Sequence, residues 1–153
     1  MEQLNGLSMV YPMKYQSVFR PGLFAGQTII VTGGGSGLGR CTAHELASLG
    51  ATVALVGRKI QNLNALQQEI NAAGGQASVH VCDIRYEALA TSMGSTVLAQ
   101  HGAIHHLVNN AGEQFPALAK DLTLNGWEAV IKNNLTDGFL VSRECYTQWM
   151  EDH

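Results

Sequence analysis

The chain has 153 residues, a formal net charge of −3 and 46% hydrophobic residues, which suits a globular protein with one core. With nine Lys and Arg residues it is not basic enough to suggest a nucleic-acid partner, and no apolar run reaches the length of a membrane helix. Three scattered cysteines without a Cys-x-x-Cys indicate free thiols in a reducing compartment, so we expect a cytoplasmic protein.

The first stretch, residues 1–22, has no clear hydrophobic period. It lacks an apolar segment flanked by basic residues, which argues against a secretory signal, and Pro21-Gly22 marks a break at its end. We therefore expect a flexible lead-in over 1–22 and one domain over 23–153.

A Gly-rich stretch, Thr32-Gly33-Gly34-Gly35-Ser36-Gly37-Leu38-Gly39, organises the chain. It follows the β-branched apolar run 27–31, which predicts a buried strand, and precedes 40–49, which predicts a helix. A turn of this kind gathers free backbone N–H groups at a helix N-terminus, where phosphate binds. Glycine tolerates positive φ and has no Cβ to hold a pyrophosphate away. We predict a phosphate-binding turn, with an ordinary Gly-rich loop as the alternative.

Strands and helices then alternate. Further strands are predicted over 51–56, 77–82 and 105–108, with helices between them that end at Gly74-Gly75 and near Gln100. The inward-facing helix residues are expected to be Ile60, Leu63, Leu66, Ile70, Leu89, Met93, Val97 and Leu98. Continuous apolar strands joined by helical crossovers predict an α/β fold, a Rossmann-type doubly wound parallel sheet with helices on both faces.

The last region is predicted to be helical. Thr123 is a candidate N-cap, and Trp127, Val130 and Ile131 form an apolar side. Asn133-Asn134 predicts a local distortion, because asparagine side chains compete for backbone hydrogen bonds, before a helix over 135–150. We expect Trp149 and Met150 to pack, and Lys120, Asp121 and Glu144 to be solvated.

The segments that carry candidate chemistry all follow strand ends: 32–39, 57–59, 83–85 and 109–112. In a parallel sheet, ligands bind beyond the carboxyl ends of the strands. These segments are therefore predicted to form one site.

Arg58 and Lys59 stand where the ribose 2′ position of a dinucleotide is expected, about twenty residues beyond the turn. An acid there binds the 2′-hydroxyl of NAD, whereas an arginine accommodates a 2′-phosphate. We therefore predict NADP(H), with NAD(H) as the alternative. Two solvated basic residues at a helix start would give the same pattern.

Other polar residues leave two interpretations open. Asp83 fits either a cap of the next segment or an acceptor for an adenine amino group. The run 109–112 fits either a close approach to a flat ligand or an ordinary turn. His105 and His106 are adjacent in a strand and face opposite ways, and no further ligand stands beside them, so no metal site is predicted.

Taken together, Thr32-Gly33-x-x-x-Gly37-x-Gly39, Asp83, Asn109-Asn110-Ala111-Gly112 and Asn134 resemble the short-chain dehydrogenase/reductase family. The resemblance runs from about Phe24 to the last residue. It implies that the glycines hold a pyrophosphate, that Asp83 holds adenine, that 109–112 shape the nicotinamide side, and that Asn134 acts in catalysis by holding a water in a proton relay. The expected cofactor-binding residues are Thr32, Gly33, Gly35, Ser36, Gly37, Leu38, Gly39, Arg58, Lys59, Asp83, Ile84, Asn110, Ala111 and Gly112.

A finer resemblance is carried by 112–117, Gly126-Trp127 and the helix over 145–150. These look like the branch of peroxisomal trans-2-enoyl-CoA reductases, dienoyl-CoA reductases and citronellol dehydrogenases. The implied reaction is hydride transfer between NADP(H) and a small carbonyl, alcohol or enoyl-CoA substrate, and the implied full-length assembly is a homo-oligomer.

The chain departs from the family in two places. His105 stands where many members have an acid. In addition, none of the four tyrosines has a lysine four residues later, so the family's Tyr-x-x-x-Lys is absent, as is its catalytic serine strand. We therefore expect the amino-terminal part of an oxidoreductase, incomplete at its C-terminal end and inactive alone. The alternative is a non-catalytic dinucleotide-binding module.

Overall fold

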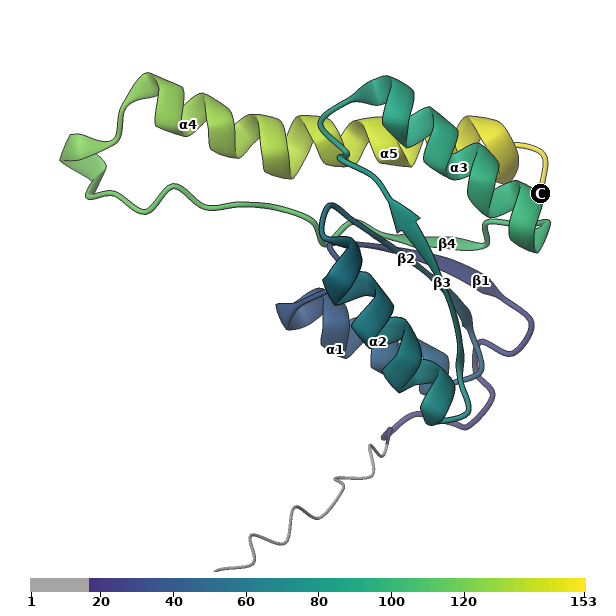
Figure 1. Cartoon of the computed structure of the whole chain (residues 1–153). Coiled ribbons are helices and arrows are strands. Elements are labelled where there is room, and N and C mark those ends of the chain that lie inside the picture. The colour runs from purple at the N-terminus through teal and green to yellow at the C-terminus, as the bar shows by residue number, and fades with distance from the viewer. Residues whose placement is uncertain (1–16) are drawn as a thin grey trace, which may run out of the picture.

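The computed structural model describes residues 17–153 and contains one parallel sheet with the strand order β3-β2-β1-β4 (Figure 1). Its strands are β1 (Thr28–Thr32), β2 (Thr52–Gly57), β3 (Gln76–Val81) and β4 (His106–Val108). The chain first adds β2 and β3 on one side of β1 and then returns to add β4 on the other side, so the strand order reverses between β1 and β4. The expected lead-in lies mostly outside the described residues and stays a prediction.

Helices cover both faces of the sheet, as predicted (Figure 1). On one face lie α1 (Gly37–Ser48) and α2 (Ile60–Ala72); on the other lie α3 (Glu87–His101) and α5 (Asp137–Cys145). Alternate residues of β1 enter two separate cores. Ile29 and Val31 pack with Leu66 of α2, whereas Ile30 packs with Val97 of α3 and Val141 of α5. Both sides of β1 are buried, which explains its unbroken apolar sequence.

The C-terminal helical region is one long rod made of α4 (Leu124–Ile131), the π-helical segment η2 (Lys132–Thr136), α5 and a second π-helical segment, η3 (Tyr146–Met150). Thr123 caps α4, because its Oγ1 accepts a hydrogen bond from Gly126 N at 3.1 Å. The distortion predicted at Asn133-Asn134 is confirmed, although it widens the helix instead of ending it. A short 3-10 turn, η1 (Ala119–Asp121), precedes the rod.

Several helix residues predicted to face inward are exposed. Trp127 and Ile131 lie on α4, which extends beyond the sheet and has no core beneath it (Figure 1). Ile60 is the first residue of α2, beyond the carboxyl end of β2, and Leu89 faces the open side of the edge strand β3. The packing predicted for Leu63, Leu66, Ile70, Met93, Val97, Leu98, Trp149 and Met150 is confirmed.

Two further expectations concern the sheet edge and Glu144. Within residues 17–153, β4 pairs only with β1 and is an edge strand, so the sheet is open there as expected. Glu144 is not solvated: its side chain is 12% exposed, because it lies beside Arg143 and accepts a hydrogen bond from Gln148 Nε2 at 3.2 Å. No helix formed by residues 17–153 has the length and apolar character needed to cross a bilayer.

Candidate functional site

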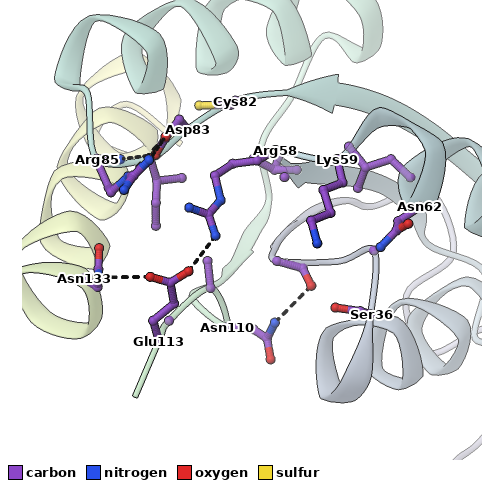
Figure 2. Close-up of a pocket in the computed structure, with 18 of the residues that line it drawn as sticks. Ser36, Arg58, Lys59, Asn62, Cys82, Asp83, Arg85, Asn110, Glu113 and Asn133 are labelled. Atoms are coloured by element: carbon purple, nitrogen blue, oxygen red, sulfur yellow. Dashed lines mark hydrogen bonds and ion pairs between the residues drawn. The ribbon is translucent and has the colours of Figure 1, made fainter. Parts of the chain in front are cut away.

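A cleft of about 640 Å³ lies at the carboxyl ends of β1, β2, β3 and β4. All the segments that were predicted to converge contribute to it, and η2 closes one side (Figure 2). The predicted site residues that line it are Gly33, Gly35, Ser36, Leu38, Arg58, Lys59, Asp83, Ile84, Asn110, Ala111, Gly112 and Asn134.

The Gly-rich turn forms the floor beside the N-terminus of α1. Gly33 and Gly37 have φ angles of +66° and +52°, a region that disfavours other residues. The N-cap Ser36 makes no side-chain capping bond, and the first turn of α1 carries no acid. The positive end of the helix therefore faces the cleft without a neutralising partner, which favours a bound anion.

Three residues expected to bind the cofactor are not among those that line the cleft, and they shape the turn: Thr32, Gly37 and Gly39. Gly39 packs against the turn so closely that a Cβ there would lie 2.4 Å from the carbonyl oxygen of Gly33. A larger residue would therefore push the turn away from the helix that it begins.

Thr32 joins β1 to the loop after β4. Its side chain is fully buried; Oγ1 donates to Val108 O at 3.2 Å and accepts from the backbone nitrogens of Asn110 and Ala111, both at 3.0 Å. Asn110 Nδ2 donates back to Thr32 O at 2.9 Å. One hydroxyl thus fixes the backbone that forms the cleft wall beside the Gly-rich turn. Asn109, by contrast, points toward α5, where its Nδ2 lies 2.7 Å from Ser142 Oγ.

Charged side chains gather at the cleft mouth, and most of them are paired (Figure 2). Arg58 Nη2 donates to Glu113 Oε1 at 2.7 Å, and Arg85 Nε donates to Asp83 Oδ1 at 2.8 Å. The hydrogen bonds from Arg85 hold the pKa of Asp83 below its ordinary value. Lys59 forms no ion pair with any of residues 17–153, so its charge is free to meet an anion.

The two roles considered for Asp83, a local cap and an acceptor for an adenine amino group, both use its carboxylate oxygen atoms. Asp83 Oδ1 accepts from the backbone nitrogen of Arg85 at 3.2 Å, so the side chain does hold the turn before α3. It also lines the cleft, where an adenine amino group would reach it. Asp83 thus stabilises the turn ahead of α3, whose N-cap is Tyr86, and its role toward adenine stays a prediction.

Asn134 reaches the cleft from η2. Its Nδ2 donates to Glu113 O at 2.8 Å and to Val130 O at 2.9 Å. A Cβ on Gly112 would lie 2.1 Å from Asn134 Oδ1, so a glycine is needed there for the asparagine to fit. The π-helical turn thus places this side chain against the loop after β4.

Arg85 lies in a segment predicted to join the site but was given no role there, and the cleft residues outside the predicted segments include Glu113, Asn62 and Asn133. The available signal for Glu113 was its position directly after the strand-end segment 109–112. Cys82 also lines the cleft, but burial raises the pKa of its thiol to about 11, which keeps it protonated and unreactive at neutral pH.

The histidines at the start of β4 have hydrogen-bond partners nearby. No group of three His, Cys, Asp or Glu residues within 17–153 is placed to hold a metal ion. His105 Nδ1 accepts from Thr28 N at 3.0 Å, whereas His106 Nε2 lies 2.6 Å from Gln27 Oε1. Their partners are local and structural.

The residues present fit a dinucleotide phosphate. The cleft combines an uncapped helix N-terminus with the cations Lys59 and Arg58. The turn between them has no room for a side chain at Gly33, where a Cβ would lie 2.9 Å from Asn110 Nδ2, so its backbone is left open to a ligand. Backbone N–H groups and cations of this kind recognise phosphate oxygens.

Comparison with known proteins shows that the chain is similar to oxidoreductases. A probable 2,4-dienoyl-CoA reductase of Bacillus subtilis (strain 168) is 34% identical over 82% of this chain and 49% of its own, and a glucose 1-dehydrogenase of Gluconobacter oxydans (strain 621H) is 35% identical over 84% and 49%. This chain spans about half the length of these curated relatives.

Solved structures agree in fold and in branch. A citronellol catabolism dehydrogenase (AtuB) of Pseudomonas aeruginosa PAO1 matches with a TM-score of 0.84 and 56% identity, over 89% of this chain and 56% of that one. A metagenomic short-chain oxidoreductase in complex with NADP matches with a TM-score of 0.72 and 38% identity, over 79% and 55%. Proteins named as members of two of the three groups in the predicted branch, the dienoyl-CoA reductases and the citronellol dehydrogenases, are thus among those it resembles.

The family model described as short chain dehydrogenase matches residues 27–153, which includes every strand of the sheet and the whole cleft. The chain belongs to the short-chain dehydrogenase family.

Proposed function

We propose that the chain binds NADP(H) in this cleft and provides the cofactor half of an oxidoreductase. The observation that carries the proposal is the meeting of the uncapped α1 N-terminus with Arg58 and Lys59 in one cleft. The helix end and Gly-rich turn would hold the pyrophosphate, and the two cations would meet the 2′-phosphate.

The remaining site residues take roles around that placement. Asp83 and Ile84 would contact the adenine end, whereas Asn110, Ala111 and Gly112 would shape the wall beside the nicotinamide. When bound, the cofactor supplies or accepts a hydride. Asn134 would hold a water for proton transfer. No tyrosine of this chain is followed by a lysine four residues later, so no proton donor is assigned to it.

For the whole protein we propose a small carbonyl, alcohol or enoyl thioester as substrate, and assembly as a homo-oligomer. Support comes from the relatives, one of which is named a dienoyl-CoA reductase and another a citronellol catabolism dehydrogenase. A non-catalytic dinucleotide-binding module is the alternative, and it makes the same cleft but predicts no turnover.

Titration of the purified protein with NADPH and NADH, followed by ligand fluorescence, tests the proposal. We expect saturable binding of NADPH that is tighter than that of NADH. Arg58→Gln should raise the Kd for NADPH about tenfold, the lower end of what a charged hydrogen bond contributes, and leave NADH binding unchanged.

Lys120→Gln is the matched control, because it removes an exposed cation outside the cleft. Its Kd values should equal those of the wild type. Wild-type protein that is folded and binds neither cofactor would refute the proposal.

A further inference from the structure

Glu113 lies at the cleft mouth, between the end of β2 and the π-helical segment η2 (Figure 2). Its Oε1 is 2.7 Å from Arg58 Nη2, and its Oε2 is 3.5 Å from Asn133 Nδ2. One carboxylate therefore links two walls of the cleft that are distant in the sequence.

The backbone of Glu113 is held as firmly as its side chain. Its carbonyl oxygen accepts a hydrogen bond from Asn134 Nδ2 at 2.8 Å, and the same nitrogen donates to Val130 O within the helical rod. Gly112, the preceding residue, packs directly against Asn134. This backbone anchor to the rod keeps the Glu113 side chain within reach of Arg58.

The carboxylate occupies a donor, Arg58 Nη2, that a phosphate would use. A guanidinium presents the same fork of N–H groups to either anion, and two anions at one guanidinium repel each other. The Arg58 and Glu113 side chains are 49% and 53% exposed, so an arriving ligand can reach the pair and replace one partner.

No other arginine at the cleft substitutes for Arg58. Arg85 is held by both oxygens of Asp83, and Lys59 is the one cleft cation among the described residues that has no ion-pair partner. A 2′-phosphate that approaches Lys59 must therefore compete with Glu113 for the Nη2 donor of Arg58 and meet the charge repulsion of its carboxylate.

We infer, in a step that rests on the proposed function, that Glu113 is a specificity-determining residue for the cofactor. Its carboxylate competes with the 2′-phosphate for Arg58 and so weakens the binding of NADPH relative to NADH, which has a hydroxyl at that position. The preference for NADPH is then smaller than Arg58 and Lys59 alone would produce.

Glu113→Gln tests this inference, because it removes the charge and keeps the shape of the side chain. The Kd values of the purified protein for NADPH and NADH would be measured by fluorescence titration. We expect the Kd for NADPH to fall about two- to fivefold, the range that an exposed ion pair covers, with no change for NADH. Glu128→Gln, an exposed glutamate of α4 outside the cleft, is the matched control and should change neither value.

A double-mutant cycle with Arg58→Gln separates competition from a general charge effect. If the two side chains compete as inferred, Glu113→Gln has no effect once Arg58 is absent. A gain in NADPH affinity that persists in the Arg58→Gln background, or an equal change for both cofactors, would overturn the inference.

Thermal unfolding of each variant shows whether it is folded. Glu113→Asp offers a second route, because it keeps the charge but shortens its reach to Arg58, and we expect a smaller gain in the same direction. Wild-type protein that binds neither cofactor refutes the proposed function, whereas wild-type binding with an unchanged NADPH to NADH ratio in Glu113→Gln refutes only the role of Glu113.

Discussion

Replacing Gly39 with alanine tests whether the shape of the Gly-rich turn determines cofactor binding. The added Cβ would lie 2.4 Å from Gly33 O and 2.4 Å from Asn110 Nδ2. Since ordinary contacts begin at 3.4 Å, the turn and α1 must separate by about 1 Å. That movement would shift the backbone N–H groups that are expected to face the pyrophosphate.

The magnitude follows from two opposing effects. Overpacking costs about 1–3 kcal/mol, and the change from glycine to alanine inside a helix recovers about 0.5–1 kcal/mol. The upper end applies because Gly33 O is a backbone atom, so we expect a net loss of about 2 kcal/mol and a Tm lower by about 4–8 °C. Loss of one backbone hydrogen bond to a phosphate would raise the Kd for NADPH about ten- to a hundredfold.

Calorimetry and NADPH titration measure the two effects separately. Gly102→Ala is the control: this C-cap of α3 has a φ of +76° and no atom within 4 Å of an added Cβ. It should lose about 1–2 kcal/mol through backbone conformation alone and bind NADPH normally. A Gly39→Ala protein with the expected fall in Tm and wild-type NADPH affinity would refute the role of the turn.

Two further predictions concern stability. Thr32→Val should lower the free energy of unfolding by about 2–4 kcal/mol, because the backbone N–H groups of Asn110 and Ala111 lose their acceptor. The control is Thr52→Val, whose hydroxyl bonds Gln76 in an exposed position, and it should change the free energy of unfolding by no more than about 0.5 kcal/mol. Urea unfolding measures both values. Equal losses in the two variants would contradict the role given to Thr32. Burial lowers the pKa of His80 and of His101, whose rings share Ser78 Oγ at 2.8 Å, so the unfolded chain takes up protons first as the pH falls below about 6.5. Stability should therefore be fully present above that pH and decline below it, by at most about 1.4 kcal/mol per pH unit for each histidine, and His101→Gln should reduce this slope between about pH 5 and 7. An unchanged slope in that variant would exclude His101 as a cause.

The sheet and its two helical layers could be predicted because their signals are local. A β-branched run such as 27–31 is apolar on both sides, which only a strand covered on both faces requires. Helix periodicity is weaker evidence: it identifies an apolar side but not whether anything lies beneath it. Trp127 and Ile131 show the difference, because α4 extends past the sheet and leaves them exposed.

The position of the cleft followed from the strand ends, but the roles of several residues within it did not. Thr32 and Gly39 were predicted to bind the cofactor, which stays a prediction, and the structure shows a further role that the motif did not indicate, because both hold the backbone of the turn in place. A motif records which residue types a site requires. It does not distinguish a residue that touches the ligand from one that shapes the backbone behind it.

The electrostatics of the cleft mouth show why local sequence is insufficient for cofactor preference. The prediction of NADP(H) used the absence of an acid beside Arg58 at the end of β2. The fold supplies an acid there after all, because the loop after β4 brings Glu113 to the same guanidinium across 55 positions of sequence. Lys59 keeps the mouth attractive to a phosphate, whereas Glu113 opposes its capture by Arg58. If the chain binds NADP(H) as proposed, we expect its cofactor preference to depend on the balance of these three side chains from two strand ends, and a substitution in either loop should shift that preference.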